Sequence, residues 1–197
     1  MPEKIYISAE DLLCDAYRLA AIIMQSGFRP DFIIGVWRGG TPVGVAVQEL
    51  MDYFGIKTDH IAIRTASYTG IGERDDEVRV FGLKYIIRNI NAENRLLIVD
   101  DVFDTGKSVD AIIHELSIRT RRNTPHDIRI ATPWFKPGNN LTDRVPDYYL
   151  HETEKWLVFP HELDGLSQED IFTHKSSCLK EIFQSLHDLN IRPVMNG

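Results

Sequence analysis

The chain has 197 residues, 43% of them hydrophobic and 26% charged, a composition typical of a globular protein with one substantial core. Its formal net charge of −7 disfavours a nucleic-acid binder that depends on broad phosphate neutralisation. No apolar run approaches the roughly 20 residues of a membrane helix, and the N-terminal segment lacks the apolar region of a signal peptide. Cys14 and Cys178 have no metal-ligand neighbours, so we expect a cytoplasmic protein, with Cys14 in the core.

The first predicted elements are a helix, a strand and a second helix. Ser8 begins a capping-box pattern, apolar residues then recur at helical spacing, and Gly27 ends the helix. Residues 31–35 are typical of a short buried strand. The second helix is expected to have Thr41 as its N-cap and Pro42 at its first position.

The rest of the chain alternates between strands and helices, which indicates an α/β fold with a mainly parallel central sheet flanked by helices. A polar segment with glycines is expected to form a mobile loop at 66–78. After residue 165 we expect one amphipathic helix, which divides the chain into a domain (1–165) and a C-terminal helical appendage (166–197). The further predicted elements are strands at 60–64, 96–99, 128–132, 148–150 and 156–159 and a helix at 110–121.

The segment 96–108 carries the strongest functional signal. A fully apolar strand ends in Asp100 and Asp101, and the small polar residues Asp104–Ser108 then open a helix. Ligands of open α/β sheets bind beyond the carboxyl ends of the strands, and backbone N–H groups at a helix start form an anion site. Gly106 allows a phosphate to approach the backbone closely. The segment therefore predicts a phosphate cradle beside carboxylates that can accept from a ribose diol.

Other interpretations of this segment fit less well. Gly106-Lys107-Ser108 is compatible with the end of a Walker A loop, but that loop needs a glycine five residues before Gly106, where Asp101 stands. A phosphoacceptor site or a surface turn explains a strand that ends in two acids. Neither explains the Asp-Thr-Gly sequence that begins at Asp104.

Segment 96–108 resembles the motif with which type I phosphoribosyltransferases bind phosphoribosyl pyrophosphate (PRPP). The shared features are an apolar strand, the acid pair, two apolar residues, Asp-Thr-Gly and a small hydroxyl residue at Ser108. Two earlier segments are similar to those of the hypoxanthine-guanine and xanthine-guanine members: Arg38-Gly39-Gly40 to their pyrophosphate loop, and Ser67-Tyr68 to the start of their lid. Related purine enzymes often carry a non-proline cis peptide at the bond that corresponds to Trp37–Arg38.

The later part of the chain resembles the base-binding segments of the same enzymes. Lys136 corresponds to a lysine that contacts the 6-oxo group of the purine, and Trp156 to an aromatic ring that stacks on the base. An ammonium group only donates, so it favours a 6-oxo acceptor over the 6-amino group of adenine. The alternatives are a surface lysine at a sheet edge and a core tryptophan. His161-Glu162 departs from the Trp and acid that often follow the proline in this family, which leaves the reading of the purine 2-position open.

The resemblance implies a type I phosphoribosyltransferase fold with a small hood formed by the N-terminal segment and the segments after residue 136. It implies a purine-salvage enzyme that transfers ribose 5-phosphate from PRPP to hypoxanthine, guanine or xanthine and releases pyrophosphate. Mg²⁺ is the implied cofactor, and a homodimer or homotetramer without nucleic-acid or membrane partners is the implied assembly. A phosphoribosyltransferase for another base and a non-catalytic, ligand-sensing regulator of the same fold are the alternatives.

The resemblance also assigns roles residue by residue. Asp104 is the expected catalytic residue, which handles the proton at N7 of the purine. Asp100 and Asp101 are expected to hold the ribose diol and the metal. For Arg74 the alternative is a solvated loop charge. The residues expected to bind PRPP are Arg38, Gly39, Ser67, Tyr68, Arg74, Asp100, Asp101, Asp104, Thr105, Gly106, Lys107 and Ser108, and those expected to bind the base are Lys136, Trp156 and Leu157.

Overall fold

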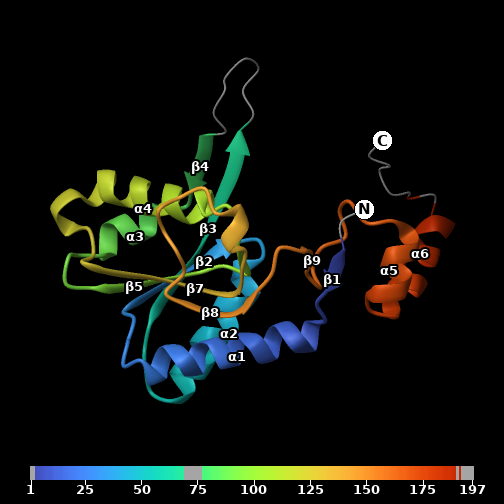
Figure 1. Cartoon of the computed structure of the whole chain (residues 1–197), viewed down its shortest axis with the longest axis horizontal. Coiled ribbons are helices and arrows are strands. Elements are labelled where there is room, and N and C mark those ends of the chain that lie inside the picture. Colours follow the sequence, from blue (N-terminus) through green and yellow to red (C-terminus); the bar gives the residue numbers. More distant parts are fainter. Residues whose placement is uncertain (1–2, 69–76, 190, 192–197) are drawn as a thin grey trace. The chain divides into compact units, whose positions relative to one another are not determined.

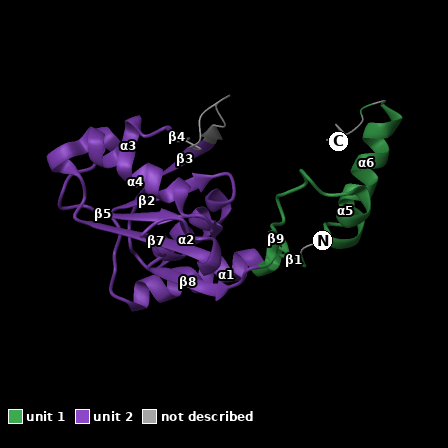
Figure 2. Cartoon of the chain, turned by 45° about the horizontal axis from the view of Figure 1, so that its top comes forward, with its two compact units in different colours: residues 1–11, 155–197 green, residues 12–154 purple. Residues whose placement is uncertain are grey.

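The computed structural model describes residues 3–68, 77–189 and 191 of the chain. The chain forms two compact units, coloured separately in Figure 2: residues 1–11 with 155–197, and residues 12–154. None of the described helices is long and apolar enough to span a membrane. In chain order, the elements labelled in Figure 1 are β1 (Lys4–Tyr6), α1 (Ala9–Gln25), β2 (Phe32–Trp37), α2 (Gly40–Tyr53), β3 (Asp59–Tyr68), β4 (Glu77–Phe81), α3 (Lys84–Asn89), β5 (Arg95–Val99), α4 (Lys107–Thr120), β7 (Asp127–Phe135), β8 (Tyr148–Glu152), β9 (Trp156–Val158), α5 (Gln168–His174) and α6 (Cys178–Asp188); the short β6 (Val102–Phe103) lies between β5 and α4.

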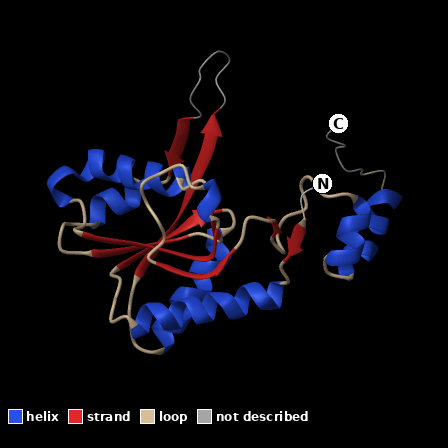
Figure 3. Ribbon diagram, viewed as in Figure 1, coloured by secondary structure: helices blue, strands red, loops and turns tan. Residues whose placement is uncertain are grey.

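The larger unit is built on a seven-stranded sheet in the order β4-β3-β2-β5-β7-β6, with β8 also paired to β7. All its strand pairs are parallel except β3 with β4. Figure 3 shows the strands in red between two layers of helices, and Figure 1 identifies α3 and α4 on one face and α1 and α2 on the other. The predicted α/β fold with a mainly parallel sheet is therefore confirmed.

The central strands β2 and β5 are buried on both faces, as the apolar runs in the sequence predict. Ile34 and the run Leu96–Val99 are all fully buried. Side chains of β2 and β5 that point to one face pack against α3 and α4 in a continuous apolar cluster. This rigid centre fixes the carboxyl ends of neighbouring strands, where the segments that follow β2, β5 and β7 begin.

The smaller unit joins the two ends of the chain. Its strands β1 and β9 pair in parallel, with Lys4 opposite Trp156. Tyr6 ties α5 to β1, because its hydroxyl donates to Oδ1 of Asp170 at 2.7 Å and its ring stacks on His174 at 3.8 Å. The predicted domain boundary after residue 165 falls inside this unit.

Several predicted element boundaries are wrong, two of them next to glycines. Helix α2 begins at Gly40 with Gly39 at its N-cap, so Thr41 is not the cap. Helix α4 begins at Lys107, three residues before the predicted start at 110, because Gly106 adopts a left-handed conformation (φ 76°) and turns the chain directly into the helix. Strand β3 extends to Tyr68, into the segment predicted to be a loop.

Two further expectations are corrected. Cys14 is exposed, because the helical period places Asp15 rather than Cys14 on the buried face of α1. Cys178 is exposed as well. The single predicted C-terminal helix is two helices, α5 and α6. The break falls at Lys175, whose extended backbone ends α5.

Candidate active site

Three predicted site segments follow three adjacent parallel strands. Arg38 follows β2, Asp100 follows β5 and Lys136 follows β7, and these strands are neighbours in the sheet. The ends stay in register through backbone contacts: the Asp100 N–H donates to the Ala131 carbonyl at 3.2 Å, and the Lys136 N–H donates to the Phe103 carbonyl at 2.9 Å. The fold thus brings these sequence-distant segments to one edge of the sheet.

The glycines after β2 permit a very close approach to the acid pair. A Cβ added to Gly39 would lie 1.8 Å from Oδ2 of Asp101, and one added to Gly40 would lie 2.6 Å from the Cα of Asp100. Only glycine therefore allows the start of α2 to lie against Asp100 and Asp101. The Trp37–Arg38 peptide bond is cis, as the resemblance implies.

The acid pair makes this region electrostatically unfavourable without a cation. Asp101 is buried, and its backbone N–H donates to Oδ1 of Asp100 at 3.0 Å. Burial, and then the nearby Asp101 carboxylate, raise the pKa of Asp100 well above its usual range. A bound cation would relieve both effects, because it favours the ionised carboxylates.

The acid pair suits Mg²⁺ rather than a metal held by protein ligands alone. Among the described residues, no group of three or more His, Cys, Asp or Glu side chains gathers in a way that would hold a metal ion. Mg²⁺ is commonly bound by one or two carboxylates, with substrate phosphates and water completing the octahedron. Asp100 and Asp101 fit that donor set.

The turn into α4, where the sequence predicts a phosphate cradle, lines a cavity. The lining of a cavity of about 210 Å³ runs from Asp100 to Gly106 and includes Ser108 and Val109. Gly106 is buried and left-handed, and the first N–H groups of the 14-residue helix α4 lie beyond it with no partner inside the helix. Such a helix start attracts anions through its N–H groups and its dipole. The hydroxyl of Ser108 accepts from Thr65 of β3 at 3.3 Å.

Asp104 and Lys136 face one another beside this cavity. The Lys136 side chain is 8% exposed, and its Nζ lies 3.2 Å from Oδ2 of Asp104. The other carboxylate oxygen, Oδ1, accepts from Nδ2 of Asn139 at 2.8 Å. Lys136 is therefore a buried lysine with a charged partner, not the surface lysine of the alternative interpretation.

The remaining predicted residues are placed differently. Ser67 and Tyr68 are the last residues of β3, while Arg74 lies outside the described residues. Trp156 and Leu157 belong to the smaller unit, where Leu157 is buried and Trp156 is 58% exposed, so Trp156 is not a core tryptophan.

In the smaller unit, the segment after β9 is held by its own contacts. The ring of His161 stacks on Phe159 at 5.9 Å, and Oε2 of Glu162 accepts from the Phe159 N–H at 3.0 Å. Lys175 donates to the Phe159 carbonyl, and burial lowers the pKa of Lys175. His161 and Glu162 thus have defined structural contacts where the sequence departs from the family pattern.

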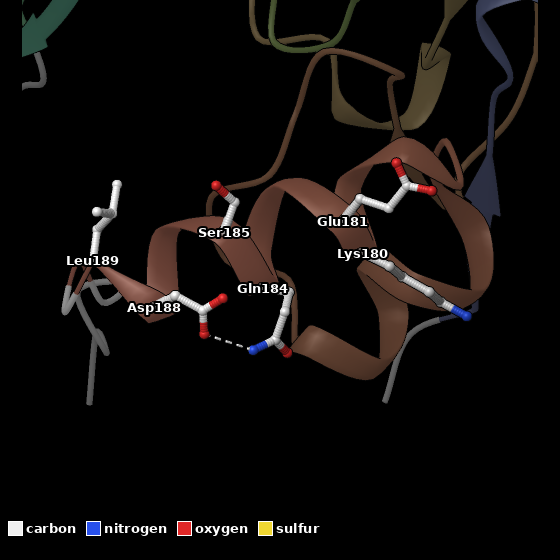
Figure 4. A pocket seen from close by; sticks show the side chains of 6 residues that line it. All are labelled: Lys180, Glu181, Gln184, Ser185, Asp188 and Leu189. Carbon is white, nitrogen blue, oxygen red and sulfur yellow. Dashed lines mark hydrogen bonds between the residues drawn. The ribbon is translucent and has the colours of Figure 1, made fainter.

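A broad hollow on α6 is not a comparable site. Figure 4 shows its lining side chains along a single helix, with a hydrogen bond from Gln184 to Asp188 at 3.0 Å. Every lining residue is exposed, and no strand ends or helix starts converge there. The strand-end cavity remains the candidate active site.

Sequence reasoning missed Asn139 and Thr65. Asn139 lies three residues after Lys136, in a Pro-Gly-Asn turn that gives a turn signal but not its direction. Thr65 lies in mid-strand, and only the pairing of β3 within the sheet brings it to Ser108. Both contacts depend on how segments far apart in the chain are placed.

Comparison with known proteins identifies the family. A family model described as a phosphoribosyl transferase domain matches residues 7–166, most of the chain. The chain belongs to the phosphoribosyl transferase family. The family predicted from segment 96–108 is thus confirmed. No curated protein sequence matches the chain.

Solved structures share the fold, among them two phosphoribosyltransferases. A purine phosphoribosyltransferase from Pyrococcus horikoshii is 28% identical, with 84% of this chain and 97% of that one covered and a TM-score of 0.66. A Helicobacter pylori xanthine-guanine-hypoxanthine phosphoribosyltransferase is 20% identical, with 82% and 96% covered and a TM-score of 0.62. A Neisseria gonorrhoeae hypothetical protein with bound ppGpp is 19% identical, with 83% and 92% covered and a TM-score of 0.64.

Proposed function

We propose that this phosphoribosyltransferase transfers ribose 5-phosphate from PRPP to a 6-oxopurine and releases pyrophosphate, as in purine salvage. One observation carries the choice of base: the buried Lys136 ammonium lies 3.2 Å from the Asp104 carboxylate, beside the phosphate cradle. A 6-oxopurine with its proton on N7 presents an acceptor, O6, next to a donor, N7–H. A lysine next to a carboxylate is the complementary pair.

The cradle and the acid pair supply the proposed PRPP site. Backbone N–H groups at the start of α4, with the hydroxyls of Thr105 and Ser108, would bind the 5′-phosphate. Arg38 and Gly39 would bind the pyrophosphate, and Asp100 and Asp101 the ribose hydroxyls and Mg²⁺. When bound, Mg²⁺ supplies charge neutralisation between the carboxylates and the polyanion.

The proposed reaction needs little covalent chemistry from the protein. N9 of the base forms a bond to C1 of the ribose as the C1–oxygen bond to pyrophosphate breaks, and its electron pair leaves with the pyrophosphate. The proton on N7 passes to Oδ2 of Asp104, which leaves a neutral N9-linked base. The protein positions the reactants and stabilises the charge that develops.

The other assignments stay proposals that rest on the resemblance. They comprise base contacts by Trp156 and Leu157, PRPP contacts by Ser67, Tyr68, Arg74 and Lys107, a cytoplasmic location and a homodimer or homotetramer. The match to the Pyrococcus horikoshii purine phosphoribosyltransferase over 84% of the chain supports a purine substrate.

A turnover assay with Mg²⁺, PRPP and a panel of bases tests the function. We expect nucleoside monophosphate from hypoxanthine, guanine or xanthine, and little from adenine or uracil. Equal turnover with adenine or uracil would favour a phosphoribosyltransferase for another base. PRPP binding without turnover of any base would favour the ligand-sensing regulator.

A further inference from the structure

The segment between β7 and β8 is fastened to the start of α4. The Leu141 N–H donates to the Thr105 carbonyl at 3.0 Å, and Nε of Arg144 donates to Asp110 at 2.8 Å. A Cβ on Gly106 would lie 2.6 Å from the hydroxyl of Thr142, so this segment lies directly against the cradle. Any residue that it presents to Asp104 is therefore held in a defined place.

Asn139 is the residue of this segment that contacts Asp104. Its Nδ2 lies 2.8 Å from Oδ1 of the carboxylate. Two hydrogen bonds hold the backbone here: the Asn139 N–H donates to the Lys136 carbonyl at 3.2 Å, and the N–H of the preceding Gly138 donates to Oε1 of Glu154 at 2.9 Å. The Asn139 amide thus links this segment to the Asp104 carboxylate.

The two oxygens of Asp104 have donors of different kinds. Oδ2 faces the Lys136 ammonium, the group that the proposed function directs to O6 of the base, while Oδ1 faces the Asn139 amide. When Lys136 turns to the base, Oδ2 loses that donor and can accept the N7 proton. Oδ1 stays with Asn139, whose amide does not ionise and therefore does not compete for the proton.

We propose that Asn139 is a positioning residue, which fixes the rotation of the Asp104 carboxylate so that Oδ2 points to N7 of the bound base. The inference rests on the proposed function. A carboxylate has a broad terminal torsion, so one anchored oxygen determines where the other points. A hydrogen bond to one oxygen also leaves the second available for the proton transfer.

The test compares Asn139→Ala with the isosteric Asn139→Asp. Asn139→Ala should lower kcat about 10- to 100-fold, because small misplacements of reacting groups cost rate on that scale. PRPP affinity, measured by calorimetry with Mg²⁺, should stay within about 3-fold of wild type, because the backbone cradle is untouched. Asn139→Asp should lower kcat further than Asn139→Ala, because its carboxylate repels Asp104. If Asn139 only shaped the loop, the isosteric Asn139→Asp would instead keep a higher kcat than Asn139→Ala.

Asn140→Ala is the matched control. Nδ2 of Asn140 donates to the Arg144 carbonyl at 2.8 Å, so this variant loosens the same segment without touching Asp104. Its kcat should stay within about 3-fold of wild type. Unchanged kcat in Asn139→Ala, an equal loss in Asn140→Ala, or a faster Asn139→Asp would each overturn the inference while leaving the proposed function in place. A wild type inactive with every base would overturn both.

Discussion

At the scale of single residues, the proposed choice of base depends most on Lys136. A buried ammonium is tolerated only with a charged or hydrogen-bonding partner, and Asp104 provides one at 3.2 Å. In the proposed complex O6 of the purine becomes that partner. Adenine presents an amino group instead, which leaves two donors facing each other.

Replacing Lys136 should therefore change selectivity as well as rate. Lys136→Gln should lower kcat/KM for hypoxanthine about 10- to 100-fold, because a neutral donor replaces a charged one in a hydrogen bond worth about 1.5–3 kcal/mol. The ratio of kcat/KM for hypoxanthine to that for adenine should also fall, because the glutamine carbonyl can accept from the adenine amino group. Steady-state kinetics with both bases measure this. The exposed Lys84 of α3 is the matched control, and Lys84→Gln should leave both values unchanged. A parallel loss for both bases would contradict the contact with O6.

The Asp100 carboxylate should lower the stability of the folded protein while it contributes to PRPP binding. The raised pKa of Asp100 means that the ionised carboxylate is less favourable in the folded than in the unfolded protein. This cost to stability is present at pH values above the pKa of the unfolded state, and it disappears as the pH falls below that pKa. At pH 7, Asp100→Asn should therefore raise the free energy of unfolding, while PRPP binding with Mg²⁺ weakens at least about 10-fold.

Denaturant unfolding and calorimetry measure the two effects of Asp100→Asn. The exposed Asp143 provides the control, since Asp143→Asn should change neither quantity. If Asp100→Asn proved less stable than wild type at neutral pH, the carboxylate would be favourably paired in the folded protein. That result would contradict the electrostatic description of the acid pair.

At the scale of elements, a buried polar contact ties α1 to β8. Asp15 is 5% exposed, and its carboxylate oxygens lie 2.9 Å from Arg18 and 2.8 Å from Nε2 of His151. The ring of His151 packs on Trp134 of β7 at 4.4 Å. This cluster fixes the helix against the sheet at a position where the sequence indicated only an apolar face.

Removing the carboxylate should loosen that contact. Asp15→Ala should lower the free energy of unfolding by about 1–3 kcal/mol, because it leaves the partly buried His151 without its partner. Chemical denaturation measures the change. Glu10, exposed on the same helix, gives the control, and Glu10→Ala should stay within about 0.5 kcal/mol of wild type. Equal effects of the two substitutions would show that the buried contact contributes nothing.

The central strands and the polar turn after β5 could be predicted from the sequence, whereas several connections could not. β5 is a continuous apolar run bounded by polar residues, and the Asp-Thr-Gly motif from Asp104 follows it at fixed spacing. The start of α2 was misplaced because it depends on how closely Gly39 approaches Asp101. Asn139 was missed because its contact depends on the path of a loop, which local pattern does not determine.

At the scale of the whole molecule, the chain is acidic although its proposed substrate, PRPP, is an anion. Its net charge is −7, and Asp100 and Asp101 lie at the proposed binding cavity. The negative net charge repels an anion at long range, and the two carboxylates repel a pyrophosphate at the cavity itself. In the proposed complex, local N–H groups, Arg38 and a bound cation would supply the attraction.

PRPP binding should consequently depend on the metal. With EDTA present, affinity should fall at least about 100-fold, because PRPP and the acid pair then meet as like charges. Calorimetric titrations with and without Mg²⁺ measure this, and Ca²⁺ in place of Mg²⁺ tests the preference for the smaller ion. Equal affinity in EDTA would remove the metal role of Asp100 and Asp101.

The most direct test of the central claim is a competition between two bases in one reaction. Wild-type protein receives PRPP, Mg²⁺ and equal concentrations of hypoxanthine and adenine, and the ratio of the two nucleotide products gives the ratio of their kcat/KM values. The pairing of Lys136 and Asp104 predicts at least about 100 molecules of inosine monophosphate for each adenosine monophosphate. A ratio near one, or an excess of adenosine monophosphate, would contradict the assignment of a 6-oxopurine substrate.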